Sequence, residues 1–432
     1  MNKKIIGLFL GLLMVLSIAY VGAGKQAISK NVNTFEKLTT KNENIESTQM
    51  LVSDEITVIL RPSPGLIFSR GIEIVFTNNG PDTINNIIWS CVFSTDSGFI
   101  LLNDEYRGEI DEIQPGEEQV VQCSPFGLGQ IQVQFEGMYG KNALRSDVSA
   151  FLFLPFIFNM QNTDDILTLD ISGLASLGEN YAYEGWVIVD GAPVSTGTFG
   201  VNDEGELMKT QFNVDADNLA AATAFVLTIE PFPDSDPAPS STHILAGDFT
   251  DETADLNIGH PAAFGDDFTS STGEYLLATP STTTTDDELS GVWFLNPNMG
   301  DPIPGLSVPD LPAGWKYEGW AVIDGMPVST GKFIDPGMAD EGNPYSGPEP
   351  TPPFPGEDFV ENAPSGLTFP TSLEGDPIVL TIEPDPDNSP APFLLKPLVG
   401  VVPDPAMDHT VYMMDNNAEA TNPTGTATIG TV

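Results

Sequence analysis

The chain has 432 residues, with 61 acidic against 15 basic side chains and a formal net charge of -46. Coulomb repulsion from such a surface disfavours nucleic acids and anionic membranes as partners. Hydrophobic residues make up 41% of the chain, which is enough for packed cores and excludes a disordered acidic tail. With 41 glycines and 37 prolines, the composition favours many short strands joined by turns over long helices.

The N-terminal region has the pattern of an export signal. Two lysines precede an uncharged apolar run at residues 5–21, and the residues after it are small enough for a signal peptidase. We therefore predict a signal peptide or N-terminal anchor at residues 1–23 and a polar linker at 24–52. The run approaches membrane-spanning length, so an uncleaved anchor is the alternative to cleavage. Either outcome places the protein in the extracellular space or cell envelope, with a membrane contacted only through this segment.

Residues 53–159 consist of short alternating apolar runs separated by turn residues, which predicts an all-β, sandwich-like domain. The turns are chemically specific, because Asn-Gly-Pro-Asp at 79–82 and Gln-Pro-Gly-Glu at 114–117 fit positions of positive or fixed φ. The run at 150–157, AFLFLPFI, is too short to span a membrane and is interpreted as a buried strand. The phrases FTNNGPDTINNIIWSCVF and IDEIQPGEEQVVQC resemble the immunoglobulin-like domains of prokaryotic surface proteins.

The two cysteines, Cys91 and Cys123, both lie in strand-like segments of this domain. In an exported protein they predict one disulfide, with a free cysteine pair as the alternative. Two cysteines and three scattered histidines nearly exclude a Cys/His zinc site.

The rest of the chain contains an internal repeat. YEGWVIVDGAPVSTGTF at 183–199 recurs as YEGWAVIDGMPVSTGKF at 317–333, and LTIEP at 227–231 recurs at 380–384. The two offsets, 134 and 153, differ by 19 residues, so we place an insertion in the proline-rich stretch at 343–357. The residues that define the repeat are Tyr183, Trp186, Gly191, Pro193 and Glu230 in the first copy and Tyr317, Trp320, Gly325, Pro327 and Glu383 in the second.

Each copy predicts a β unit: a half-buried strand, an Asp-Gly hairpin turn, a returning strand, and a central strand ended by proline. These phrases resemble the extracytoplasmic C-terminal domain of anti-sigma-K factors. The resemblance implies two tandem β-sandwich units outside the membrane, at residues 160–262 and 263–432. In that family, sigma-factor binding belongs to a separate cytoplasmic domain, commonly with a Cys/His zinc motif. The resemblance therefore implies fold and location rather than sigma-factor binding.

Catalytic candidates in the repeat have simpler structural interpretations. Its serines and threonines have no nearby histidine or lysine to activate them, so we interpret them as strand or turn hydroxyls. The paired Glu184 and Glu318, and Glu230 and Glu383, could form acid–base dyads as in glycosidases. Because they recur in both copies, a structural role is favoured. The tryptophans could stack on sugar rings, but core anchoring is the simpler interpretation.

The acidic loops raise the question of calcium. Asp234, Asp236, Asp385 and Asp387 lie in Asp-Pro loops that supply hard oxygen ligands, although not at EF-hand spacing. We treat solvation of these loops as the default and calcium as the only candidate cofactor.

The sequence therefore predicts a non-enzymatic exported or cell-surface protein with a binding or structural role and an unidentified protein or envelope component as its partner. The alternative is an extracytoplasmic sensor that signals through a separate membrane protein.

Overall fold

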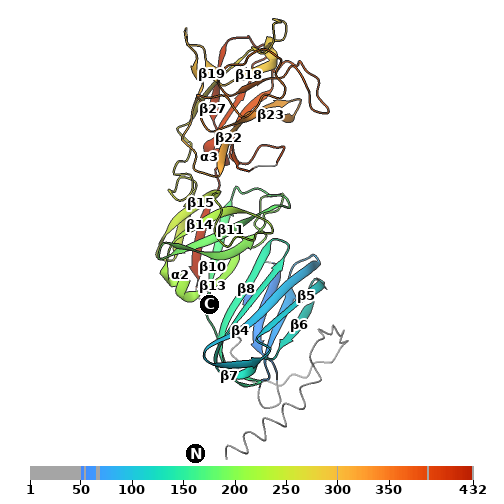
Figure 1. Ribbon diagram of the computed structural model, residues 1–432, viewed down its shortest axis with the longest axis vertical. Coiled ribbons are helices and arrows are strands. Elements are labelled where there is room, and N and C mark those ends of the chain that lie inside the picture. The colour runs from blue at the N-terminus through green and yellow to red at the C-terminus, as the bar shows by residue number, and fades with distance from the viewer. Residues whose placement is uncertain (1–49, 53–54, 65–68, 299, 387–388, 431–432) are drawn as a thin grey trace, which may run out of the picture. The chain divides into compact units, whose positions relative to one another are not determined.

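The computed structural model describes residues 50–52, 55–64, 69–298, 300–386 and 389–430 (Figure 1). Almost every element is an antiparallel strand, so the prediction of an all-β protein is confirmed. Within these ranges, no helix has the length and apolar character needed to cross a bilayer. The predicted signal peptide or anchor and most of the predicted linker lie outside the described residues.

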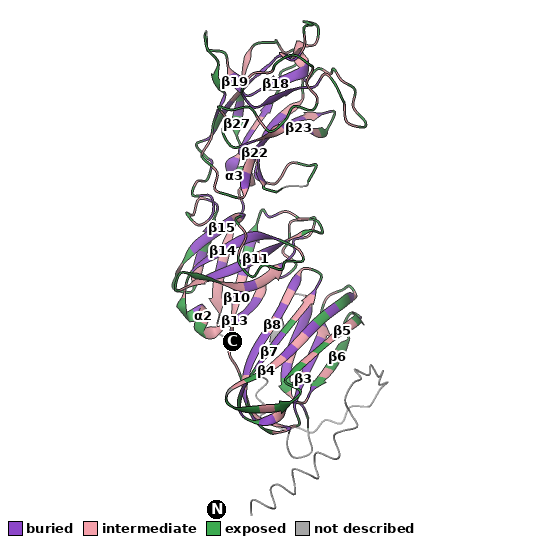
Figure 2. Ribbon diagram, in the orientation of Figure 1, coloured by how far each residue is buried: buried purple, intermediate pink, exposed green. Residues whose placement is uncertain are grey.

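The first domain is a sandwich of two sheets. The first sheet contains β1 (Met50–Val52), β2 (Ile56–Pro62), β3 (Ile72–Asn78) and β6 (Glu118–Cys123), in that order. The second contains β5 (Glu105–Ile113), β4 (Ile84–Leu102), β7 (Phe126–Tyr139), β8 (Asn142–Leu154) and β9 (Phe156–Asn162), in that order. Both sheets contribute to one core, where the rings of Phe76 and Phe135 lie 5.7 Å apart. Alternation of buried and exposed residues along β7 gives that strand one core face and one outer face (Figure 2).

The prediction of a single buried strand at residues 150–157 is wrong. β8 ends at Leu154 and β9 begins at Phe156, with Pro155 between them. The side chains on these strands alternate between faces, so Phe151 and Phe153 are 37% and 38% exposed. Apolar composition alone could not reveal which of them face outward.

The two cysteines lie between the sheets of this domain. Cys91 on β4 and Cys123 on β6 are buried free thiols. A hydrogen bond to Cys123, together with burial, raises the pKa of Cys91 well above its usual value. The thiols are therefore neighbours, and their oxidation to a disulfide stays a prediction.

The second region is an eight-stranded sheet in the order β12-β11-β14-β15-β16-β28-β10-β13. Its strands are β10 (Asp164–Ser172), β11 (Tyr181–Val189), β12 (Ala192–Phe199), β13 (Gln211–Asp215), β14 (Ala222–Pro231), β15 (His243–Thr250), β16 (Thr253–Asn257) and β28 (Thr424–Gly430). A short helix, α2 (Ala216–Ala221), joins β13 to β14, and Asp215 caps it by accepting a hydrogen bond from the amide of Asn218.

The third region is a nine-stranded sheet in the order β23-β22-β25-β26-β27-β17-β18-β24, with β21 also paired to β17. Its strands are β17 (Thr272–Leu277), β18 (Gly291–Trp293), β21 (Leu306–Ser307), β22 (Trp315–Ile323), β23 (Met326–Phe333), β24 (Gly356–Asp358), β25 (Pro377–Pro384), β26 (Leu398–Val401) and β27 (Val411–Asn416). The smaller elements are η1 (Glu288–Ser290), the paired strands β19 (Leu295–Asn296) and β20 (Ile303–Pro304), and α3 (Ala418–Thr421).

The two large sheets have matching strand orders but draw one strand from different parts of the chain. In the third region the sixth position is filled by β17, which directly precedes β18. In the second region it is filled by β28, which pairs with β10 on one side and β16 on the other. Figure 1 shows this strand in red among green strands. The predicted division at residues 262 and 263 did not include this pairing, because β28 follows the second copy yet completes the sheet of the first.

Candidate functional site

The repeated phrases form the same hairpin in both copies. β11 and β12 are joined by Asp190 and Gly191, with φ angles of 51° and 78°, and β22 and β23 by Asp324 and Gly325, with 51° and 81°. Positive φ at both turn positions suits an Asp-Gly pair, because the type I′ turn matches the twist of the strands.

The returning strand of each hairpin lies at a sheet edge and contains a bulge. Pro193 and Pro327 lie on the edge strands β12 and β23, where a missing amide donor breaks no ladder. The register then shifts at the same place in both copies, which leaves Thr196 and Thr330 as the extra residues. The two copies therefore share their fine backbone structure as well as their sequence.

The repeated aromatic residues anchor the core. Trp186 and Trp320 are 3% and 2% exposed, and each indole nitrogen donates to a strand threonine, Thr228 or Thr381, at 2.9 Å. The buried Tyr183 stacks on Phe199 with ring centroids 5.7 Å apart, and Tyr317 stacks on Phe333 at the same distance. These side chains pack inside the domain, so they offer no open face to a sugar.

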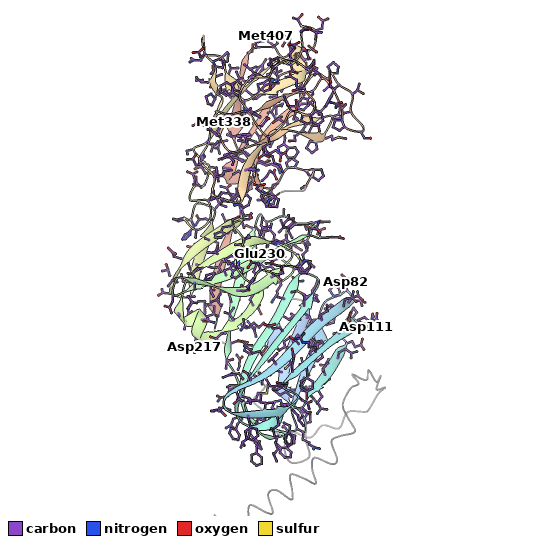
Figure 3. All side chains as sticks on the ribbon, viewed as in Figure 1. Asp82, Asp111, Asp217, Glu230, Met338 and Met407 are labelled. Carbon is purple, nitrogen blue, oxygen red and sulfur yellow. The ribbon has the colours of Figure 1, made fainter. Side chains whose placement is uncertain are left out.

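The paired glutamates of the first copy lie near each other on one face of the sheet. The register pairs Glu184 with Thr228, two residues from Glu230, so the two glutamates are diagonal neighbours. Glu184 accepts a hydrogen bond from the hydroxyl of Ser195. Glu230 accepts one from the hydroxyl of Thr228 and two from the amide of Ser240, at 2.8 and 3.1 Å. The carboxylate of Glu230 thus ties the loop after β14 to the end of that strand, where Figure 3 labels it.

The second copy repeats this network. Glu318 accepts a hydrogen bond from the Ser329 hydroxyl at 2.5 Å, and Glu383 accepts from the Thr381 hydroxyl at 2.5 Å and the Phe393 amide at 2.8 Å. Each domain therefore uses its second glutamate to hold the loop that follows its central strand.

Burial sets the protonation of the first-copy carboxyls. It raises the pKa of Glu184 to about 6 against the opposing effect of the Ser195 hydrogen bond, and it also raises the pKa of Glu230. A pKa near 6 suits an acid catalyst. However, Glu230 and Glu383 are each only 1% exposed, and their hydrogen bonds run to their own strands and loops. This geometry fits a structural clamp better than a dyad that receives substrate.

A second set of buried carboxyls, which sequence reasoning missed, holds the proline-rich stretch of the second copy. Asp358 accepts hydrogen bonds from Trp293 at 2.7 Å and from the amide of Ser281 at 2.8 Å. Glu357 accepts from the Ser346 hydroxyl and, at 3.3 Å, from the Tyr345 amide. Both carboxyls are fully buried. The only signal in the sequence was an acidic pair next to a proline-rich stretch, which is common on solvated surfaces.

The predicted calcium ligands have other partners. Asp234 accepts from the amide of Asp236 at 2.9 Å, and Asp236 accepts from that of Ala238 at 3.1 Å. Asp385 forms an ion pair with Lys316 at 3.1 Å, and Asp387 lies outside the described residues. In the part of the chain that the structure describes, no three His, Cys, Asp or Glu side chains are grouped to hold a metal ion. Calcium binding stays a prediction.

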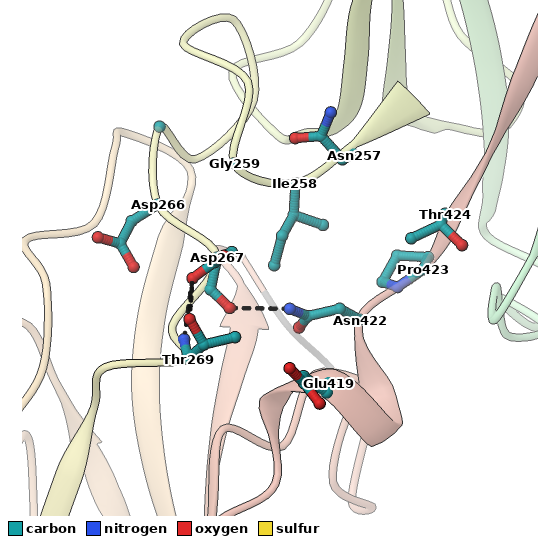
Figure 4. Close-up of a pocket in the computed structure, with 11 residues that line it drawn as sticks. Asn257, Ile258, Gly259, Asp266, Asp267, Thr269, Glu419, Asn422, Pro423 and Thr424 are labelled. Atoms are coloured by element: carbon teal, nitrogen blue, oxygen red, sulfur yellow. Dashed lines mark hydrogen bonds between the residues drawn. The ribbon is translucent and has the colours of Figure 1, made fainter. Parts of the chain in front are cut away.

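One pocket, of about 690 Å³, lies beside the segment that leads into β28 (Figure 4). Asp266, Asp267 and Glu419 contribute acidic groups to its lining. Hydrogen bonds from Thr269 lower the pKa of Asp267, and its carbonyl accepts from Asn422 at 2.8 Å. The bond from Asn422 joins the loop after β16 to the chain before β28.

The comparisons with known proteins match one segment. Residues 156–244, from β9 to the start of β15, match the family model described as anti-sigma-K factor rskA, C-terminal. The matched segment contains the first-copy hairpin and its paired glutamates. No curated protein and no solved structure matches the chain.

Proposed function

We propose that this chain is a non-enzymatic protein of the cell surface or envelope in which the two large sheets are rigid binding or structural modules. The observation that carries the proposal is the shared polar network of the two copies. The tryptophan, threonine and glutamate of each copy form hydrogen bonds to one another or to the adjoining loop. Such a network stabilises a domain, and duplicating it provides a second rigid module rather than a second reactive centre.

The family match favours a second candidate, a sensor of the cell envelope. Residues 156–244 match the C-terminal part of an anti-sigma-K factor, and the second copy repeats its hairpin, bulge and glutamates. In this proposal both copies belong to that family, and the chain acts through a separate membrane protein.

The first experiment tests whether the protein is exported. We expect the full chain, carrying a C-terminal tag in a bacterial host, to be digested when protease is added to spheroplasts. A matched variant that lacks the apolar run at residues 5–21 should be protected inside the cell. Protection of the full chain would contradict the proposed location.

Cross-linking then separates the two candidates. Met338 and Met407, labelled in Figure 3, are 62% and 66% exposed and suit replacement by a photoreactive residue. A sensor should give one discrete cross-linked band in the membrane fraction. A structural module should give adducts only with itself or with wall material.

A further inference from the structure

The outer face of the five-stranded sheet in the first domain has an apolar end. Phe99 on β4 pairs with Leu128 on β7, Leu128 pairs with Phe153 on β8, and Phe153 pairs with Phe156 on β9. Phe99, Leu128 and Phe153 are 50%, 38% and 38% exposed, and Phe151 beside this row is 37% exposed. Large side chains project from this end in Figure 3. We call this surface, with Leu101 and Leu102 at 57% and 56% exposure, the apolar tip.

The apolar tip lacks the charged side chains that are common in the rest of the chain. The segments that form it, residues 97–103, 119–135 and 148–163, contain no charged side chain. Acidic and basic residues make up 18% of the whole sequence. The composition of the tip therefore differs from that of the rest of the chain, because all three of its segments lack charged side chains. Contiguous exposed apolar surface of this kind marks a contact with a membrane or another protein.

The position of β1 indicates which of these it is. Met50, where β1 begins, pairs with Ile59 at the middle of β2, and Val52 pairs with Thr57, so β1 runs away from the Pro62 end of β2. The Pro62 end adjoins the tip, because Pro62 pairs with Ile72 and the neighbouring Gly71 amide donates to the Pro155 carbonyl at 3.0 Å. The start of β1 therefore faces the end of the domain that carries the tip. In the sequence, β1 is preceded by the apolar run at 5–21, which approaches bilayer-spanning length.

We propose that the apolar tip inserts its phenylalanine and leucine side chains into the interface of an electrically neutral lipid bilayer. Aromatic side chains favour this depth, where their rings leave water while the backbone stays near the headgroups. Neutral lipid is the expected surface because the acidic remainder of the chain is repelled by anionic headgroups. The proposal goes beyond the location and module role given above, and its choice of a bilayer over a protein partner rests on the proposed retention of residues 1–23 as an anchor.

The native tryptophans make a sharp test available. All five, at positions 89, 186, 293, 315 and 320, are at most 6% exposed. The tryptophan introduced by Leu128→Trp or Phe153→Trp would therefore be exposed, unlike the five native tryptophans. The matched control is Ile88→Trp, on β4 near its opposite end, where Ile88 is 62% exposed.

The full-length variants are mixed with phosphatidylcholine vesicles whose acyl chains carry bromine, which quenches only tryptophan at membrane depth. We expect a roughly twofold loss of the added emission for Leu128→Trp and Phe153→Trp, because interfacial side chains reach about 5–10 Å into the bilayer. Ile88→Trp should keep its emission, which separates insertion of the tip from simple tethering. Adding Phe99→Ser to Leu128→Trp should restore the lost emission.

Two outcomes overturn the proposal. If neither tip variant is quenched while the protein stays monomeric by sedimentation, the tip does not enter lipid. The second outcome is that Leu128→Trp is unquenched, the wild-type chain forms a dimer, and Phe99→Ser abolishes this dimer. In that case the tip binds a second copy of the chain. Both results are independent of where the protein resides in the cell, so they leave the location test unaffected.

Discussion

Buried ionisable side chains have strong local effects in this acidic chain. Lys209 is one of only four basic residues after position 150 and is 2% exposed. Its Nζ donates to the carbonyl of Ala143 on β8 and lies 4.3 Å from the centre of the Phe212 ring. Lys209 thus links the second region of the chain to the first domain. Burial lowers its pKa to about 7, because the charged amine loses hydration that these partners only partly replace.

Because of this lowered pKa, the stability of the protein should vary with pH in the alkaline range. Between about pH 7 and the ordinary lysine pKa, the unfolded chain binds a proton that folded Lys209 does not, so the free energy of unfolding should rise with pH. We expect Lys209→Met to flatten this rise, as measured by urea unfolding at pH 7 and pH 9.5. The control Lys316→Met should retain it, because the ion pairs of Lys316 with Glu341 and Asp385 raise its pKa. An equal rise in Lys209→Met and the wild type would contradict the prediction.

At the scale of elements, the proline-rich stretch of the second copy is held by carboxyls rather than by apolar packing alone. Burial raises the pKa of Glu357 to about 7, partly offset by hydrogen bonds from Ser346 and Tyr345. Burial likewise raises the pKa of Asp340 to about 7, against a hydrogen bond from the amide of Gly356. A proline-rich stretch has few amides for strand pairing, so side-chain acceptors replace the missing ladder.

Glu357 should make the protein more stable in mild acid. Its folded pKa lies above its unfolded value, so the folded state keeps a proton that the unfolded chain loses between about pH 4.5 and pH 7. The free energy of unfolding should therefore fall as pH rises through this window, by up to about 3 kcal/mol from this group. We expect Glu357→Gln to reduce the fall in urea unfolding at pH 4.5 and 7.5. Glu361→Gln, an exposed control on the neighbouring segment, should leave the fall unchanged. A fall of wild-type size in Glu357→Gln would refute this role.

At the scale of the whole molecule, β28 makes the first large sheet depend on the far end of the described chain. It lies between β10 and β16, and Ala427 at its centre is fully buried between Leu169 and Ala254. Most of its other side chains are half-buried, so backbone hydrogen bonds to both neighbours contribute much of its stability. The second copy is thus inserted into the sheet of the first, and the two folds are coupled.

Removing β28 should therefore destabilise the sheet of the first copy more than that of the second. We expect a chain that stops after Pro423 to lose at least about 3 kcal/mol, at about 1 kcal/mol for each lost hydrogen bond. Hydrogen exchange should locate the loss in β10 and β16, while β22 and β25 stay protected. A control chain that lacks only Thr431 and Val432 should match the full chain. Unchanged protection of β10 in the shorter chain would show that β28 is dispensable.

Local patterns were enough to predict the all-β class and the two repeated hairpins. The hairpin at Asp190 and Gly191 depends on neighbouring residues alone, because turn type and strand alternation act over a few positions. The aromatic and glutamate residues of the repeat were identified, but not the partners that bind them. Long-range contacts decided the rest: the pairing of β28 with β10, the burial of Lys209 and Glu357, and the outward direction of Phe153. Each depends on which distant segment covers a surface, and this is a property of tertiary packing that no short stretch of sequence encodes.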